Sequence, residues 1–126
     1  PIYIRSVETG AVLKKGTTTV INESLKQRKE KYGLLFTGYI RLDKQAMYEF
    51  FTTSDDGSQL FIDDELIVNN DGNHGMEEKS GKVLLAMGYH KIKIIYFDSG
   101  GGNGLRVHFR EEGGEKKELP AEMLWH

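Results

Sequence analysis

The sequence contains no cysteine, which excludes disulfide bonds and thiolate-bound metal ions. Only two of its 126 residues are proline, and no hydrophobic run approaches the ~18 residues of a membrane-spanning helix. Positive charge is not in excess, because 17 Lys and Arg residues are set against 19 Asp and Glu residues. Since nucleic-acid binding requires clustered positive charge, we expect no nucleic-acid partner. Because no long hydrophobic run is present, we also expect no membrane span.

The length of the chain is sufficient for one domain with a single hydrophobic core. We therefore expect residues 1–126 to form one domain. The sequence begins at Pro1 without an initiator methionine or a hydrophobic signal segment, so we expect it to be a fragment of a longer protein.

From Gly33 onward, short segments rich in β-branched and aromatic residues alternate with turn residues. Residues 2–7 also resemble a strand, whereas 24–31 fit either a helical turn or a polar strand with a loop. Short antiparallel strands at roughly ten-residue spacing are typical of a β-sandwich or barrel, so we predict an all-β fold. The strands predicted after Gly33 are 34–42, 46–54, 58–63, 65–70, 82–87, 89–97 and 105–112.

Two pairs of adjacent aspartates lie seven residues apart, Asp55-Asp56 and Asp63-Asp64. The second pair separates two strand-like segments, where a two-residue hairpin turn tolerates Asp at positive φ. The first pair precedes Gly57 and has two interpretations. It is either a turn, or a cation site in which two crowded carboxylates are neutralised by an ion such as calcium.

Two further polar segments lack the pattern of a known binding motif. The glycine-rich segment Asp98–Gly104 lacks the spacing of a phosphate-binding loop, and the segment Asn69–Glu78 lacks the ligand pattern of an EF-hand. The four histidines lack the spacing of a zinc site, and no G-x-S-x-G motif is present. We therefore predict no catalytic residues, and expect both segments to be connecting loops. The glycine-rich segment has a second interpretation, a loop whose backbone approaches a ligand or cation closely, where glycine avoids Cβ clashes.

The order of motifs along residues 34–124 resembles that of the PA14 domain family. A G-Y strand precedes a Y-x-F strand that ends in S-D-D-G-S, and L-F-I-D with a turn follows. A strand of pattern G-Y-H-x-I-x-I-x-Y-F, a glycine-rich loop and a closing L-P-A-E-M-L complete the order. The resemblance implies an antiparallel β-sandwich of jelly-roll type.

The resemblance also implies a site. In the lectin branch of the family an Asp-Asp pair, joined by a cis peptide bond, coordinates calcium together with an Asn and carbonyls of a second loop. By motif, this implies Asp55, Asp56 and Asn103 as calcium ligands, with Asp98 as an alternative, and we add His74 to the predicted ligand-binding residues.

The resemblance implies an accessory module without catalysis, belonging to an exported bacterial glycoside hydrolase of the hexosaminidase or β-glucosidase type. Its implied partners are a glycan and the parent catalytic domain, and its implied location is periplasmic, cell-surface or extracellular. The alternative is a structural module that binds no sugar. Since Trp125, the only tryptophan, lies in the closing segment, we expect no aromatic platform for a sugar ring beside Asp55-Asp56.

Overall fold

The structure is a computed structural model that describes residues 2–8, 11–18, 32–72, 75–98 and 104–125. In these ranges it contains strands and one short 3-10 helix. The elements are β1 (Ile2–Glu8), β2 (Ala11–Thr18), β3 (Tyr32–Leu42), β4 (Ala46–Asp55), β5 (Gly57–Ile62), β6 (Glu65–Asn70), β7 (Glu77–Leu85), β8 (Gly88–Asp98), β9 (Gly104–Glu111), β10 (Lys117–Glu118), the 3-10 helix η2 (Ala121–Met123) and β11 (Leu124–Trp125).

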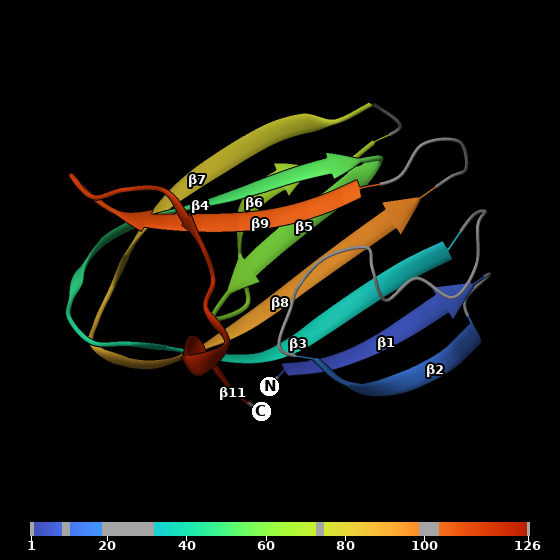
Figure 1. Cartoon of the computed structure of the whole chain (residues 1–126), viewed down its shortest axis with the longest axis horizontal. Coiled ribbons are helices and arrows are strands. Elements are labelled where there is room, and N and C mark those ends of the chain that lie inside the picture. The colour runs from blue at the N-terminus through green and yellow to red at the C-terminus, as the bar shows by residue number, and fades with distance from the viewer. Residues whose placement is uncertain (1, 9–10, 19–31, 73–74, 99–103, 126) are drawn as a thin grey trace.

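The strands form two antiparallel sheets, which confirms the predicted β-sandwich. The large sheet has the order β2-β1-β3-β8-β5-β6, with β11 paired to β3, and the small sheet has the order β10-β9-β4-β7. Figure 1 shows β8, β3, β1 and β2 side by side in the lower part of the view, with β9, β4 and β7 above them. The longest ladder joins β3 to β8 over eleven residue pairs, from Tyr32 opposite Asp98 to Leu42 opposite Gly88.

The chain passes from one sheet to the other between β4 and β5. Strand β4 belongs to the small sheet and β5 to the large sheet, and Asp56 is the one residue between them. Figure 1 shows that β4 and β8 end, and β9 begins, at the same end of the sandwich. The candidate site therefore lies where both sheets meet at this end.

Alternating residues of facing strands fill the space between the sheets. Every second residue of a strand points to the same face, and the inward-facing residues of β8 and β9 are buried: Ile92, Ile94 and Tyr96 in β8, and Leu105, Val107 and Phe109 in β9. Phe50 stacks on Phe109 within the small sheet, with ring centroids 6.3 Å apart. The buried side chains of the core are Leu34, Phe36, Ile40, Leu42, Tyr48, Phe50, Leu60, Ile62, Val68, Leu85, Ile92, Ile94, Tyr96, Leu105, Val107, Phe109 and Leu124.

Two strands differ from the prediction. Strand β7 begins at Glu77, within a segment predicted to be a polar loop, and β2 was not predicted. Both lie at an edge of their sheets, and the exposed residues of β7 from Glu77 to Ser80 lack the apolar alternation by which a strand is recognised. Residues 24–31, for which two interpretations were left open, lie outside the described residues.

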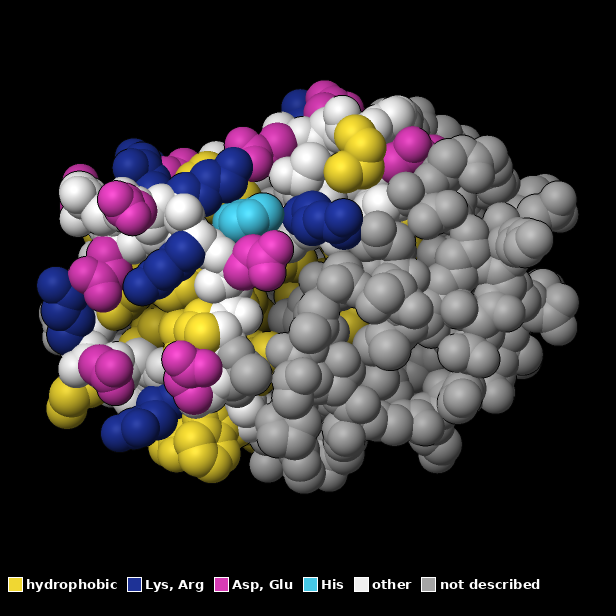
Figure 2. All heavy atoms as spheres, viewed as in Figure 1, with side chains coloured by type: hydrophobic (Ala, Val, Ile, Leu, Met, Phe, Trp, Pro, Cys, Tyr) yellow, Lys and Arg dark blue, Asp and Glu magenta, His cyan; other side chains and the backbone are white. Residues whose placement is uncertain are grey.

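The surface carries mixed charge. Figure 2 shows Lys and Arg side chains interspersed with Asp and Glu side chains over the described part of one face. Among the described residues, there is no helix of the length and apolar character needed to cross a membrane.

Candidate functional site

The Asp55-Asp56 pair lies at the crossover between the two sheets. Asp55 is the last residue of β4, opposite Gly104 of β9, and Gly57 is the first residue of β5, opposite Phe97 of β8. The peptide bond between Asp55 and Asp56 is cis, as the resemblance implied. Asp55 is half-buried, whereas Asp56 is only 6% exposed. Two adjacent carboxylates thus lie at a point where four strands meet, β4 paired with β9 and β5 paired with β8.

Buried hydroxyl groups form a hydrogen-bonded layer beneath the pair. Ser54 Oγ donates to the carbonyl oxygen of Asp56 at 2.9 Å and lies 2.7 Å from Ser58 Oγ. Ser58 Oγ donates in turn to Thr52 Oγ1 at 3.0 Å. All three hydroxyl-bearing residues are at most 2% exposed, so they link β4 and β5 without access to bulk water. Buried polar side chains of this kind are hydrogen-bonded in folded proteins and fix the backbone they contact.

Asn70 extends this layer to β6 and β7. Its Nδ2 donates to the carbonyl oxygens of Thr52 at 3.1 Å and Glu77 at 2.7 Å, and lies 3.3 Å from Ser54 Oγ. Asn70 is only 1% exposed. A side chain at the end of β6 therefore connects the crossover to the start of β7.

The hydroxyl of Tyr96 connects the crossover to β9. Tyr96 Oη donates to the carbonyl oxygen of Asp55 at 2.7 Å and accepts from the backbone nitrogen of Gly104 at 3.1 Å. Its ring lies in the core with 0% exposure. One buried side chain thus fixes the spacing between the Asp55-Asp56 backbone and the point where β9 begins.

Asp71 brings a third carboxylate to this end of the sandwich. A Cβ atom at Gly57 would lie 2.9 Å from Asp71 Oδ1 and 2.8 Å from the backbone nitrogen of Gly72. The residue after Asp56 must therefore be glycine for the segment at 71–72 to approach so closely. The backbone nitrogen of Asp71 donates to Asn69 Oδ1 at 3.3 Å, which is the local hydrogen bond expected of Asn in a turn.

The other predicted ligands have different outcomes. Asp98 is the last residue of β8 and lies one position beyond Phe97, the residue opposite Gly57, so its backbone is at the same end as the Asp pair. Asn103 and His74 lie outside the described residues. Within the described ranges, no group of three or more His, Cys, Asp or Glu side chains is close enough to hold a metal ion.

Two exposed apolar side chains at this end were missed by the sequence analysis. Phe97, 46% exposed, is paired with Gly57, the residue that follows the Asp pair, so an exposed aromatic residue belongs to this end of the sandwich. Met76, 54% exposed, lies against Gly104, where a Cβ atom would be 2.8 Å from its Sδ. The signal was available for Phe97: the alternation that buries Ile94 and Tyr96 directs residue 97 outward.

The second aspartate pair forms the β5–β6 hairpin turn, as predicted. Asp63 and Asp64 have φ of 50° and 69°. Asp63 Oδ2 lies 2.6 Å from His90 Nδ1, Asp63 Oδ1 accepts from the backbone nitrogen of Lys91 at 3.0 Å, and Lys91 Nζ lies 3.0 Å from Asp64 Oδ2. Both carboxylates are thus engaged with β8, which agrees with a structural role.

These features together define a PA14-type β-sandwich, with an aspartate pair at the crossover between its sheets. The PA14 domain family matches residues 17–122, most of the chain, and the chain belongs to this family. PA14 domains are in general accessory modules without catalytic activity.

Three known proteins illustrate what the chain is similar to. It is 24% identical over 98 residues to the anti-sigma-I factor RsgI3 of Acetivibrio thermocellus, covering 77% of this chain and 15% of that protein. An anti-sigma factor domain-containing protein from Clostridium clariflavum has a similar structure, with a TM-score of 0.87 and 23% identity over 98% of this chain and 46% of that one. A PA14 sugar-binding domain from an RTX adhesin matches with a TM-score of 0.71 and 27% identity, over 77% of this chain and 55% of that one. The chain therefore spans a small part of the curated relative and about half of each solved structure.

Proposed function

We propose that this PA14 domain binds glycan at the Asp55-Asp56 crossover with the help of a calcium ion. The observation that carries the proposal is a pair of adjacent carboxylates at the crossover between the sheets. Asp55 ends β4, Asp56 follows it with only 6% exposure, and buried hydroxyl groups hold the backbone beneath them. The sugar-binding PA14 domain of the RTX adhesin supports the same kind of ligand.

The donor set suits calcium better than a transition metal. Calcium takes six to eight oxygen ligands, from carboxylates, backbone or amide carbonyls and water. Asp55 and Asp56 would supply carboxylates, and Asn103 and Asp98 remain the ligands predicted from the second loop. When bound, calcium would accept a pair of sugar hydroxyls in place of water at its open positions.

Two side chains of the domain would support binding of the ion and the glycan. The Tyr96 hydroxyl would keep the Asp55 backbone and the start of β9 at a fixed separation, which lowers the cost of ordering the site on binding. Phe97 would contribute an exposed ring at the rim, where aromatic side chains provide contact area at small entropic cost. The proposal therefore combines an ion, a rigid frame and an apolar rim.

The test is calorimetric titration of calcium into chelator-stripped protein, with thermal melts in parallel. If calcium binds the folded state alone, stability rises by about 2.7 kcal/mol at a concentration 100 times Kd. Asp56→Asn should abolish both the heat and the shift in Tm. Asp64→Asn is the matched control, because it removes the same charge from the hairpin turn and should leave both intact. The absence of heat and of any Tm shift at millimolar calcium would refute the ion-assisted mechanism.

The parent protein is part of the proposal. A glycan-binding module is useful to an exported glycoside hydrolase, where it would hold polysaccharide near the catalytic domain. The anti-sigma-factor relatives favour a second kind of parent, a regulatory protein in which the same module would recognise a ligand. Both parents place the module outside the cytoplasm if its ligand is a cell-surface or extracellular polysaccharide. The sequence on either side of residues 1–126 would distinguish these two kinds of parent protein.

A further inference from the structure

The outer face of the large sheet carries three exposed aromatic side chains at one end. Tyr39 of β3, Tyr89 of β8 and Trp125 of β11 are 43%, 57% and 42% exposed. Trp125 is paired with Tyr39, and its ring meets that of Tyr89 edge to face, with the ring centroids 5.8 Å apart. Figure 1 shows β11 beside the end of β3 and the start of β8, away from the end where β8 terminates near the crossover. These three residues form an aromatic cluster that is separate from the Asp55-Asp56 pair.

Basic side chains flank the aromatic cluster. Alternate residues of a strand face outward, and within residues 33–41 of β3 and 89–97 of β8 the outward-facing charged residues are Arg41, Lys91 and Lys93. Arg41 is directly opposite Tyr89 in the β3–β8 ladder, and Lys91 is directly opposite Tyr39. Side chains at directly opposite positions project from the same face, with Cβ atoms about 4.5–5.5 Å apart. Each of the two tyrosine rings thus has a cation as its cross-strand neighbour.

The positive charge of this face is largely uncompensated. Lys91 Nζ lies 3.0 Å from Asp64 Oδ2, but this ion pair is exposed and contributes little, so a ligand carboxylate can replace Asp64. Lys93 Nζ lies over the ring of Phe61, 4.4 Å from its centroid. Among the described residues, no acidic side chain is paired with Arg41 or Lys93. The face is therefore basic, although the whole chain has a formal net charge of −2.

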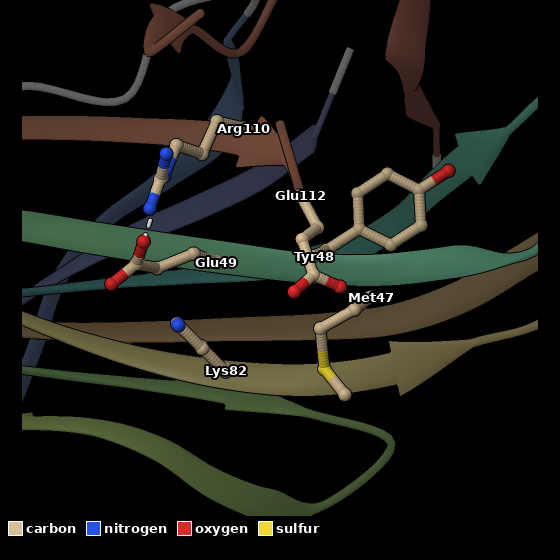
Figure 3. Close-up of a pocket in the computed structure, with 6 residues that line it drawn as sticks. All are labelled: Met47, Tyr48, Glu49, Lys82, Arg110 and Glu112. Atoms are coloured by element: carbon tan, nitrogen blue, oxygen red, sulfur yellow. Dashed lines mark hydrogen bonds and ion pairs between the residues drawn. The ribbon is translucent and has the colours of Figure 1, made fainter. Parts of the chain in front are cut away.

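The outer face of the small sheet differs, because its charges are of both signs. Figure 3 shows Glu49 and Arg110 joined to each other, with Lys82 and Glu112 near them. Arg110 Nε donates to Glu49 Oε1 at 2.8 Å. An anion would meet carboxylates as well as cations there. Of the two outer faces, that of the large sheet is thus the one that favours an anionic ligand.

A uronic acid matches both features of this face. The C–H groups of a sugar ring pack on aromatic rings, and its carboxylate accepts hydrogen bonds from Arg or Lys, which are stronger than those between neutral groups. The face is open, so a ligand chain can lie across it without entering a cavity. Neighbouring strands are about 4.8 Å apart, which is close to the length of one sugar ring. Aromatic side chains on three adjacent strands can therefore contact neighbouring residues of one polysaccharide chain.

We propose that this face binds an acidic polysaccharide that contains uronic acid residues. The aromatic cluster packs on the sugar rings, Arg41 binds one carboxylate, and Lys91 and Lys93 bind carboxylates further along the chain. At about 3.4 Å per residue, Tyr89 lies roughly 27 Å along β8 from its crossover end, so this site is independent of any ion bound there. The inference thus goes beyond the proposed function, and each can fail without the other.

The experiment titrates oligogalacturonate of about eight residues into the protein in the presence of chelator, which removes any contribution of calcium. Trp125, the only tryptophan, belongs to the aromatic cluster, so its fluorescence reports binding at this face while calorimetry reports binding anywhere. The fully methyl-esterified oligomer is the matched ligand, because it lacks only the negative charges. A cello-oligosaccharide of the same length and an oligothymidylate complete the set. Oligogalacturonate should change the fluorescence, and the two neutral oligomers should bind at least tenfold more weakly.

Two pairs of variants test the residues. Arg41→Gln should weaken oligogalacturonate binding about tenfold, as expected for loss of a charged hydrogen bond, and Tyr89→Ala should do so by a similar factor. Lys82→Gln and Leu84→Ala are the matched controls, because they remove a positive charge and an exposed apolar side chain from the outer face of the small sheet. Both controls should leave the affinity unchanged, and dichroism melts confirm that all four variants fold.

Several results would overturn the proposal. Among them are the absence of binding, binding heat without a change in Trp125 fluorescence, and equal affinity for the methyl-esterified oligomer. Equal losses in Arg41→Gln and Lys82→Gln would show that only net charge matters. Oligothymidylate binding as tight as that of oligogalacturonate would identify a surface for polyanions in general, of which nucleic acid is one, and would overturn the preference for uronic acids. Each of these results leaves the calcium-dependent function at the crossover standing.

Discussion

A single hydroxyl group, that of Tyr96, connects the crossover at Asp55 to the first residue of β9. Tyr96→Phe leaves the ring in the core and removes the donor to the Asp55 carbonyl and the acceptor for the Gly104 nitrogen. Loss of a buried partner costs about 1–3 kcal/mol. We expect Tyr96→Phe to lower the free energy of unfolding by this amount and also to weaken calcium binding, measured by denaturant melts and calorimetry.

Tyr48→Phe provides the comparison. The Tyr48 hydroxyl donates to the carbonyl oxygen of Lys44 at 2.6 Å, and its ring is buried in the same core. This substitution removes one hydroxyl on β4, far along the strand from the site. We expect a loss of stability with unchanged calcium affinity, so equal effects of both variants on calcium would contradict the role given to Tyr96.

At the scale of single residues, the sequence separates the two aspartate pairs but does not reveal what surrounds them. Asp63-Asp64 is recognisable as a turn because strand-like segments flank it directly. Tyr96, Phe97 and Asp71 reach the crossover through the pairing of strands distant in sequence, and periodicity alone does not specify which strands pair. The pairing and register of these strands determine which residues meet at the candidate site, and neither can be predicted from one sequence.

At the scale of elements, the β5–β6 hairpin is joined to β8 by a contact between Asp63 and His90. His90 Nδ1 lies 2.6 Å from Asp63 Oδ2, and His90 Nε2 lies 2.8 Å from the carbonyl oxygen of Ala86. Burial favours the neutral ring, but the hydrogen bonds to Asp63 and Ala86 and the charge of Asp63 outweigh it and raise the pKa of His90. The neighbouring Lys91–Asp64 ion pair is exposed and has no net charge.

The sign of the pH dependence follows from this raised pKa. The folded state binds a proton more tightly than the unfolded chain, so the stabilisation is fully present below the unfolded pKa of about 6.5 and is lost as pH rises through the folded pKa. We expect Tm to fall over this interval and the fall to flatten in Asp63→Asn. Asp64→Asn should keep the wild-type slope, and an unchanged slope in Asp63→Asn would show that another group titrates.

The sequence predicts interior elements better than edge elements. Residues 65–70 were predicted as a strand with the bounds that β6 has, because apolar positions and turn residues delimit them. The first two residues of β7 were predicted as part of a loop, and the predicted strand began only at Lys82, since an edge strand with one partner in its sheet tolerates polar residues. Such a strand is specified by its partner β4, whose pairing to it runs from Ala46 to Ser54.

At the scale of the whole molecule, one core joins the two sheets. Residues from β4 and β9 of the small sheet pack with residues from β3, β5 and β8 of the large sheet in a single cluster. Domains of this size with one core usually unfold in a single cooperative transition. Trp125 lies on β11 of the large sheet, so its fluorescence should report the same transition as far-ultraviolet circular dichroism, which detects strands of both sheets.

Two leucine substitutions measure how far stability depends on this shared core. Leu60 of β5 has 0% exposure and Leu84 of β7 has 60% exposure. Leu60→Ala should lower the free energy of unfolding by about 2–5 kcal/mol, through lost burial and the cavity left behind. Leu84→Ala removes the same atoms from the surface and should change it by less than about 0.5 kcal/mol. If Leu60→Ala shifted the dichroism melt but not the Trp125 fluorescence melt, β5 and β11 would unfold separately although both belong to the large sheet, and the single cooperative core would be refuted.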